Sequence, residues 1–146
     1  MKDTNNILSY ELWSGQEYNN TTTWNTENSG AIIKTSNIIS TIGEQSIQYS
    51  HHNNWDFGHI YISPISPNSD YTFSFDIYNP QGTVMVRLAS NSRLNTLSQV
   101  SIPSSDKIQH VILNCTTPSN INALYIQFFT NDSNIFYFDN LSLITG

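Results

Sequence analysis

Residues 70–78 read Asp-Tyr-Thr-Phe-Ser-Phe-Asp-Ile-Tyr, and this stretch decides the fold class of the chain. One face of it would carry Tyr71, Phe73, Phe75 and Ile77, and the other Thr72, Ser74, Asp76 and Tyr78. Because successive side chains of a β-strand point to opposite faces, this alternation predicts a strand with one buried face.

The same alternation recurs on both sides of this stretch, and helical spacing of apolar residues is almost absent. Further strands are predicted at 46–50, 59–63, 83–89, 97–102, 111–115, 124–129 and 135–144. Turn residues separate them, as Asn79-Pro80-Gln81-Gly82 does, and we expect 70–78 and 83–89 to form a hairpin around that turn. Short strands at this spacing predict an all-β fold, a two-sheet antiparallel β-sandwich of jelly-roll type, as one domain over residues 1–146.

The composition limits the classes of partner. Charged residues make up 11% of the chain, against roughly 25% in an average domain, while Asn, Ser and Thr together supply about a third. The net charge of −6 argues against a nucleic-acid partner, which needs clustered Lys and Arg. No apolar run reaches the roughly 18 residues of a membrane span, so we expect no membrane insertion.

Several short motifs follow one another in an order that resembles a known family. Ile7-Leu8 is followed by Glu11, then come Gly43 to Tyr49, Ile60 to Phe75, Thr116 to Phe128, and a closing aromatic run at 135–143. This order resembles the CenC-like, cellulose- and xylan-binding carbohydrate-binding modules of the jelly-roll group. The resemblance implies non-catalytic glycan binding by a concave β-sheet face. It also implies a module of a larger extracellular or cell-surface protein, with polysaccharide or oligosaccharide as partner.

Candidate ligand-binding residues follow from which side chains point outward. They are Tyr61, Met85, Arg87, Asn91, Tyr125, Gln127 and Phe129, with Trp55 in a neighbouring loop. An aromatic ring can cover the C–H face of a sugar, and amide or guanidinium groups can bond its hydroxyls. In the resembled family, the concave face carries an arginine and an amide or acid at the places of Arg87 and Gln127. The alternative is that the segment between Glu11 and Gly30 covers Tyr125 and Phe129.

The resemblance also implies a structural calcium ion where the first and last strands meet. Its carboxylate ligands would be Glu11 and Asp139, joined by backbone carbonyls. Calcium prefers six to eight oxygen ligands, which such a set could begin to supply.

A catalytic function is not expected. Glycoside hydrolysis needs two acids facing each other in a cleft, and Asp76 has no clear partner in the sequence. Cys115, the only cysteine, is expected to point inward. The alternative to glycan binding is a structural or protein-interaction domain of a surface adhesin or of a phage tail or baseplate assembly. Both ends stop near predicted strands, so we expect further domains in a parent protein.

Overall fold

The computed structural model of the protein describes residues 32–36, 46–50, 57–62, 65–90, 95–121, 123–130 and 135–145. Its strands are β1 (Ile32–Ser36), β2 (Ser46–Ser50), β3 (Phe57–Ile62), β4 (Asp70–Tyr78), β5 (Val84–Ala89), β6 (Thr96–Ile102), β7 (Gln109–Thr116), β8 (Leu124–Thr130) and β9 (Ile135–Thr145). In this part of the chain no helix is long and apolar enough to span a membrane.

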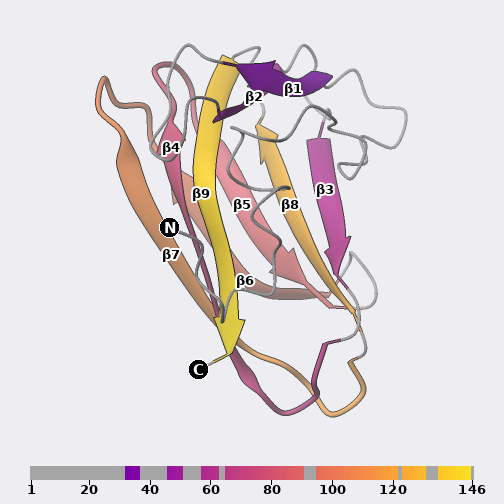
Figure 1. Cartoon of the computed structure of the whole chain (residues 1–146). Coiled ribbons are helices and arrows are strands. Elements are labelled where there is room, and N and C mark those ends of the chain that lie inside the picture. The colour runs from indigo at the N-terminus through magenta and orange to yellow at the C-terminus, as the bar shows by residue number, and fades with distance from the viewer. Residues whose placement is uncertain are drawn as a thin grey trace.

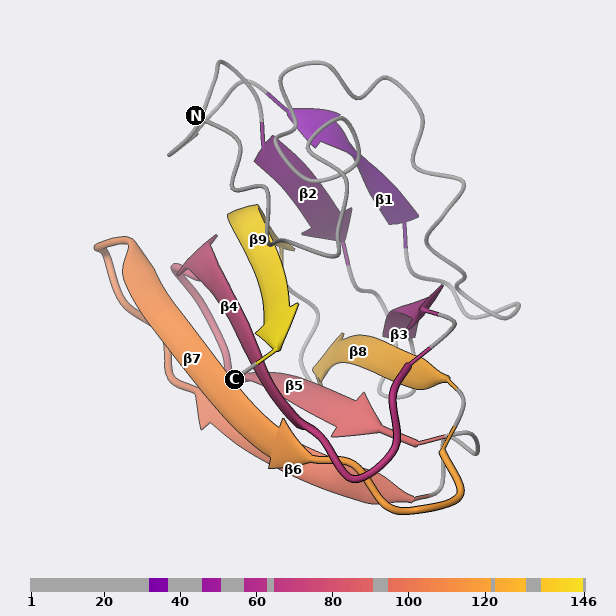
Figure 2. The same cartoon turned by 60° about the horizontal axis from the view of Figure 1, so that its bottom comes forward.

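The strands form two antiparallel sheets that face each other (Figures 1 and 2). The five-stranded sheet has the order β1-β2-β9-β4-β7, and the four-stranded sheet has the order β3-β8-β5-β6. Neighbours within a sheet come from distant parts of the chain, as β9 does between β2 and β4. The predicted all-β jelly-roll sandwich is therefore confirmed.

The core lies between the sheets and follows the predicted alternation. Strand β4 has the predicted bounds, and its apolar face is at most 3% exposed. Phe128 of β8 joins the layers, because its ring stacks on Phe138 of β9 at 4.4 Å and meets Phe75 of β4 edge-on at 5.3 Å. Burying one such side chain contributes roughly 1.5–3 kcal/mol. Alternation along single strands was thus sufficient to identify these core residues.

The expected hairpin around residues 79–82 is wrong. Strand β4 pairs with β7 and β9, whereas β5 pairs with β6 and β8 in the opposite sheet. The turn still forms: Asn79 is fully buried, its side-chain amide donates to the Gly82 carbonyl at 2.8 Å, and Gly82 has φ of 80°. Both strands point an apolar face into the same core, so alternation could not distinguish a hairpin from a crossing between sheets.

The structure also contains one strand that the sequence did not predict. The segment Ile32–Ser36 forms β1 at the edge of the five-stranded sheet, where Ile33 pairs with Tyr49 of β2. Its sequence, Ile-Ile-Lys-Thr-Ser, has no alternation of apolar and polar residues, so the pattern did not predict a strand. Pairing with β2 uses backbone hydrogen bonds, which form without such alternation. The loop and short strand expected within residues 11–30 lie outside the described residues.

A buried hydroxyl fixes the loop that leads into β4. The Thr117 side chain accepts a hydrogen bond from the Ser69 backbone N–H at 2.9 Å and donates one to the Ser66 carbonyl at 2.7 Å. The Thr117 N–H in turn donates to the Ser69 carbonyl at 2.9 Å. These bonds tie the start of β4 to the end of β7.

Candidate functional site

The outward face of the four-stranded sheet collects most of the predicted ligand-binding positions. Cross-strand pairing places His59, Gln127, Arg87 and Gln99 on one rung that crosses all four strands. The next rung carries Tyr61, Tyr125 and Ala89, and the rung on the other side carries Phe57, Phe129, Met85 and Ser101. We refer to the residues on these three rungs as the outer face of the four-stranded sheet.

Arg87 lies near the middle of this face and is half-buried. Its Nε–H donates to the Gln99 Oε1 atom at 3.1 Å, across the β5–β6 pair. Such a bond fixes the plane of the guanidinium group, whose donors have a rigid fork geometry. Gln99 was not among the predicted site residues, although alternation along 97–102 could have indicated that its side chain points outward.

Gln127 differs from the prediction. It occupies the expected outward position beside Arg87, but only 6% of it is exposed, and its Oε1 atom has no hydrogen-bond partner among the residues that the structure describes. A buried acceptor left unpaired costs about 1–3 kcal/mol. Buried polar atoms of this kind are uncommon and often correspond to a place where water or a ligand supplies the missing donor.

Two tyrosines form an aromatic pair on the adjacent rung. Tyr61 of β3 is 55% exposed, and its ring meets that of Tyr125 of β8 edge-on, with centroids 5.2 Å apart. Tyr125 itself is partly exposed. Exposed aromatic rings on a sheet offer an apolar surface next to the polar rung of Arg87 and Gln99.

The remaining predicted ligand-binding positions are less fully defined. Met85 is partly buried and pairs in register with Phe129 and with Ser101. For Phe129 the structure describes the backbone alone. Asn91 and Trp55 lie outside the described residues, as does the predicted calcium ligand Glu11.

Asp139, the other predicted calcium ligand, is buried in β9 with 2% exposure. One of its carboxylate oxygens accepts a hydrogen bond from the Asn140 N–H at 2.8 Å. Because Ile47 pairs with Phe138, Ser46 stands beside Asp139 on the neighbouring strand, and within the described part of the chain its buried hydroxyl has no hydrogen-bond partner. Among the described residues, no three His, Cys, Asp or Glu side chains group as metal ligands.

Asp76 has partners that the sequence did not indicate. Its carboxylate lies 2.7 Å from the Nδ1 atom of His110, and the Asn140 side-chain amide donates to it at 3.3 Å. It also pairs across strands with Asp139, which is buried.

Similarity to known proteins was found in the three-dimensional structure and not in the sequence. No family model matches the chain, and no curated protein matches it. The xylan-binding CBM22-1 domain of Paenibacillus barcinonensis Xyn10C is 13% identical, with a TM-score of 0.75 over 99% of this chain and 97% of that one. A CBM22 xylan-binding domain is 18% identical, with a TM-score of 0.70 over the same shares of the two chains.

A different kind of protein contains a similar domain. The enzymatically active domain of tailspike protein 4 from bacteriophage CBA120 is 15% identical, with a TM-score of 0.76. The match covers 97% of this chain and 22% of the tailspike chain. At such identities the comparisons establish the fold and leave the ligand open. The chain has the jelly-roll fold of the CBM22 carbohydrate-binding modules, which confirms at the level of fold the resemblance seen in the sequence.

Proposed function

We propose that the chain is a non-catalytic glycan-binding module, and that the concave face predicted from the sequence is the outer face of the four-stranded sheet. The observation that carries this proposal is the exposed Tyr61–Tyr125 pair one rung away from the Arg87–Gln99 pair. The tyrosine rings can cover the C–H face of a sugar, and the guanidinium and amide groups can bond its hydroxyls. The buried Gln127 Oε1 atom supports the proposal, because a sugar hydroxyl or a bridging water could supply its missing donor.

The partner proposed is a neutral polysaccharide or oligosaccharide. The net charge of −6 disfavours acidic sugars, and xylan is the first candidate because the similar CBM22 domains are described as xylan-binding. We place the protein outside the cell or at the cell surface, where such polysaccharides occur, as one part of a larger parent protein.

The test is a glycan array followed by calorimetric titration with the recognised oligosaccharide. We expect a dissociation constant between millimolar and micromolar, or about −4 to −8 kcal/mol. Tyr61→Ala and Arg87→Ala should each weaken binding at least tenfold. Tyr137→Ala is the matched control, because Tyr137 is a partly exposed tyrosine on the opposite sheet that stacks on Tyr78. Equal loss in the control, or full binding by both face variants, would reject this face as the site.

We further propose a structural calcium ion held by Asp139 and Glu11. The donor chemistry fits, because the buried Asp139 carboxylate and the buried Ser46 hydroxyl are hard oxygen ligands on adjacent strands. Calcium should raise the thermal unfolding midpoint of the wild-type protein above its value in EDTA, and magnesium should not. The rise should disappear in Glu11→Gln and Asp139→Asn. An identical midpoint in calcium and EDTA would remove the ion from the proposal.

The alternative function is a structural or protein-interaction domain of an adhesin or a phage tail assembly. It predicts an apolar outward surface, for which Ile108, Ile112 and Ile135 are candidates at 43%, 57% and 45% exposure. Analytical ultracentrifugation distinguishes the two functions. A concentration-dependent dimer that Ile112→Ser abolishes, together with a silent glycan array, would support the interaction domain.

A further inference from the structure

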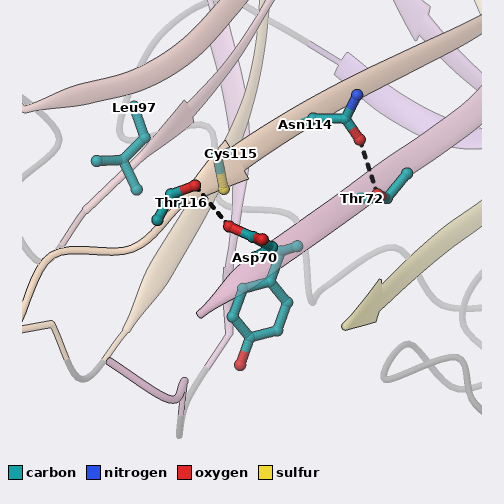
Figure 3. A pocket seen from close by; sticks show the side chains of 7 residues that line it. Asp70, Thr72, Leu97, Asn114, Cys115 and Thr116 are labelled. Atoms are coloured by element: carbon teal, nitrogen blue, oxygen red, sulfur yellow. Dashed lines mark hydrogen bonds between the residues drawn. The ribbon is translucent and has the colours of Figure 1, made fainter. Parts of the chain in front are cut away.

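A pocket of about 450 Å³ opens at one end of the sandwich, away from the outer face of the four-stranded sheet. Its lining residues are Asp70, Tyr71, Thr72, Leu97, Asn114, Cys115 and Thr116 (Figure 3). They come from the first residues of β4 and β6 and the last residues of β7. Its volume lies within the roughly 300–1,000 Å³ of small-molecule sites.

The apolar part of the pocket exists because of a bulge in β6. Leu88 pairs with Ser98 and Ala89 pairs with Thr96, so Leu97 is an extra residue without a cross-strand partner. Bulges commonly re-aim a side chain, and Leu97 packs against the core at the edge where β6 and β7 run along each other (Figure 2). Tyr71 and Cys115, which are 3% and 7% exposed, are also among the lining residues, and both point from the β4–β7 ladder toward the core.

The polar part consists of two cross-strand pairs on the β4–β7 ladder. The Thr116 hydroxyl donates to the Asp70 Oδ1 atom at 2.6 Å, and the Thr72 hydroxyl donates to the Asn114 Oδ1 atom at 2.7 Å (Figure 3). Each threonine hydroxyl therefore donates to one side-chain oxygen of the residue opposite it on the neighbouring strand. The second carboxylate oxygen of Asp70 and the amide N–H groups of Asn114 have no hydrogen-bond partner among the described residues.

This arrangement presents one acceptor and one donor group at a defined spacing. Asp70 pairs with Thr116 and Thr72 pairs with Asn114, so the two pairs lie two residues apart on one face of the ladder. That separation is about 7 Å along the strands. It is close to the width of a sugar ring with its hydroxyl groups, one of which could donate to Asp70 while another accepts from Asn114.

Charge and ligand count narrow the chemical class of the occupant. The Asp70 carboxylate disfavours an anion, and the described residues offer no group of three acidic, histidine or cysteine side chains for a metal ion. A neutral polyhydroxylated molecule matches the acceptor and the donor, which share the outward face of the β4–β7 ladder.

We propose that this pocket is a second saccharide subsite, on a different part of the sandwich from the outer face of the four-stranded sheet. The inference rests on the proposed glycan-binding function and adds a second point of contact with the polymer. Two contacts on one chain raise the apparent affinity for a polysaccharide that can reach both.

The experiment follows backbone amide shifts of the ¹⁵N-labelled protein during titration with xylohexaose, cellohexaose and any array hit. We expect shifts at Thr72, Asn114 and Thr116 that persist in Arg87→Ala, where the outer-face response is lost. In Asn114→Ala the pocket shifts should vanish, and affinity for the polysaccharide should fall about threefold to tenfold. Ile112→Ala is the matched control, because Ile112 lies on the same strand and does not line the pocket.

The outcomes separate this inference from the proposed function. Shifts on the outer face without shifts in the pocket would overturn the second subsite and leave the proposed function standing. Pocket shifts without an outer-face response would support the subsite and reject the assignment of the face. Silence at both places with every oligosaccharide would overturn both proposals.

Discussion

The Thr117 hydroxyl shows how one buried side chain holds two segments together. It is 2% exposed and satisfies the Ser69 N–H and the Ser66 carbonyl, two backbone groups in the loop before β4. Hydrogen bonding of this kind allows an irregular loop to pack against a buried strand end. The same loop sets the position of Asp70, and therefore the shape of the pocket beside it.

Replacing Thr117 with valine keeps the shape of the side chain and removes both bonds. We expect Thr117→Val to lower the free energy of unfolding by about 1–2 kcal/mol, because two partly buried hydrogen bonds to the backbone are lost. Urea denaturation followed by circular dichroism measures the change. Thr96→Val, at an exposed position of β6, is the control and should change stability by less than about 0.5 kcal/mol.

Cys115 gives a pH-dependent prediction. Burial, with a smaller effect from the Asp70 carboxylate, raises the pKa of its thiol above the ordinary value of 9.0. The folded state therefore favours the protonated thiol. The resulting stability is complete below pH 9.0 and is lost as the pH rises from there through the higher pKa of the folded state.

The stability of the wild-type protein should fall more steeply above pH 9.0 than that of Cys115→Ala. Urea denaturation of both proteins between pH 7 and pH 10.5 measures the difference, and the comparison cancels the titration of groups that they share. Parallel stability curves would show that the thiol keeps its ordinary pKa in the folded protein.

At the scale of the strand, irregularities in pairing decide where functional side chains lie. The register between β4 and β9 shifts between Ser74 and Asp76, and Asn140 adopts a left-handed backbone conformation with φ of 55°. This bulge turns the Asn140 N–H toward the Asp139 carboxylate. The bulge at Leu97 likewise places this side chain in the lining of the pocket at the end of the sandwich.

The backbone of Asn140 predicts which replacements β9 can accept. Glycine adopts a positive φ without steric cost, whereas a β-branched residue is strained there. We expect Asn140→Gly to leave the free energy of unfolding within about 0.5 kcal/mol and Asn140→Val to lower it by about 1–2 kcal/mol. Urea denaturation measures both. If glycine destabilises as much as valine, the side-chain contact with Asp76 matters more than the backbone conformation.

In the whole molecule, the residues that stabilise the core and the residues proposed to bind the ligand lie on opposite sides of the four-stranded sheet. Aromatic contacts such as Phe128 on Phe138 lie between the sheets, while the Tyr61–Tyr125 and Arg87–Gln99 pairs lie on the outer face of the four-stranded sheet. A ligand on that face would contact a sheet that is already ordered. Little backbone rearrangement should accompany binding, so binding energy should appear directly as added stability.

Ligand binding should therefore raise the unfolding temperature of the intact domain. At a free oligosaccharide concentration one hundred times the dissociation constant, we expect about 2.7 kcal/mol of stabilisation, since only the folded state binds. Differential scanning calorimetry with the array hit measures the shift. Tyr137→Ala should retain the full shift, and Arg87→Ala, which should bind at least tenfold more weakly, should retain at most about half of it; an equal shift in both variants would contradict binding at this face.

The sequence by itself determined strands β2 to β9, the core and the fold class, because alternation reports which side chains face a common interior. Residues 70–78 are the clearest case, with bounds and buried face both as predicted. It also identified Arg87 and Tyr125 as outward-facing positions. Only the tertiary structure decided that β4 and β5 belong to different sheets, since both strands present the same pattern to one core.

Pairings between distant strands likewise had no local signal. Contacts of Arg87 with Gln99 and of Asp76 with His110 depend on cross-strand register, which alternation leaves undetermined. The same holds for the burial of Gln127, because an outward position in a strand does not reveal what covers it. Alternation is a property of one strand, whereas register and covering depend on which strands meet, and that is determined only when the whole chain packs.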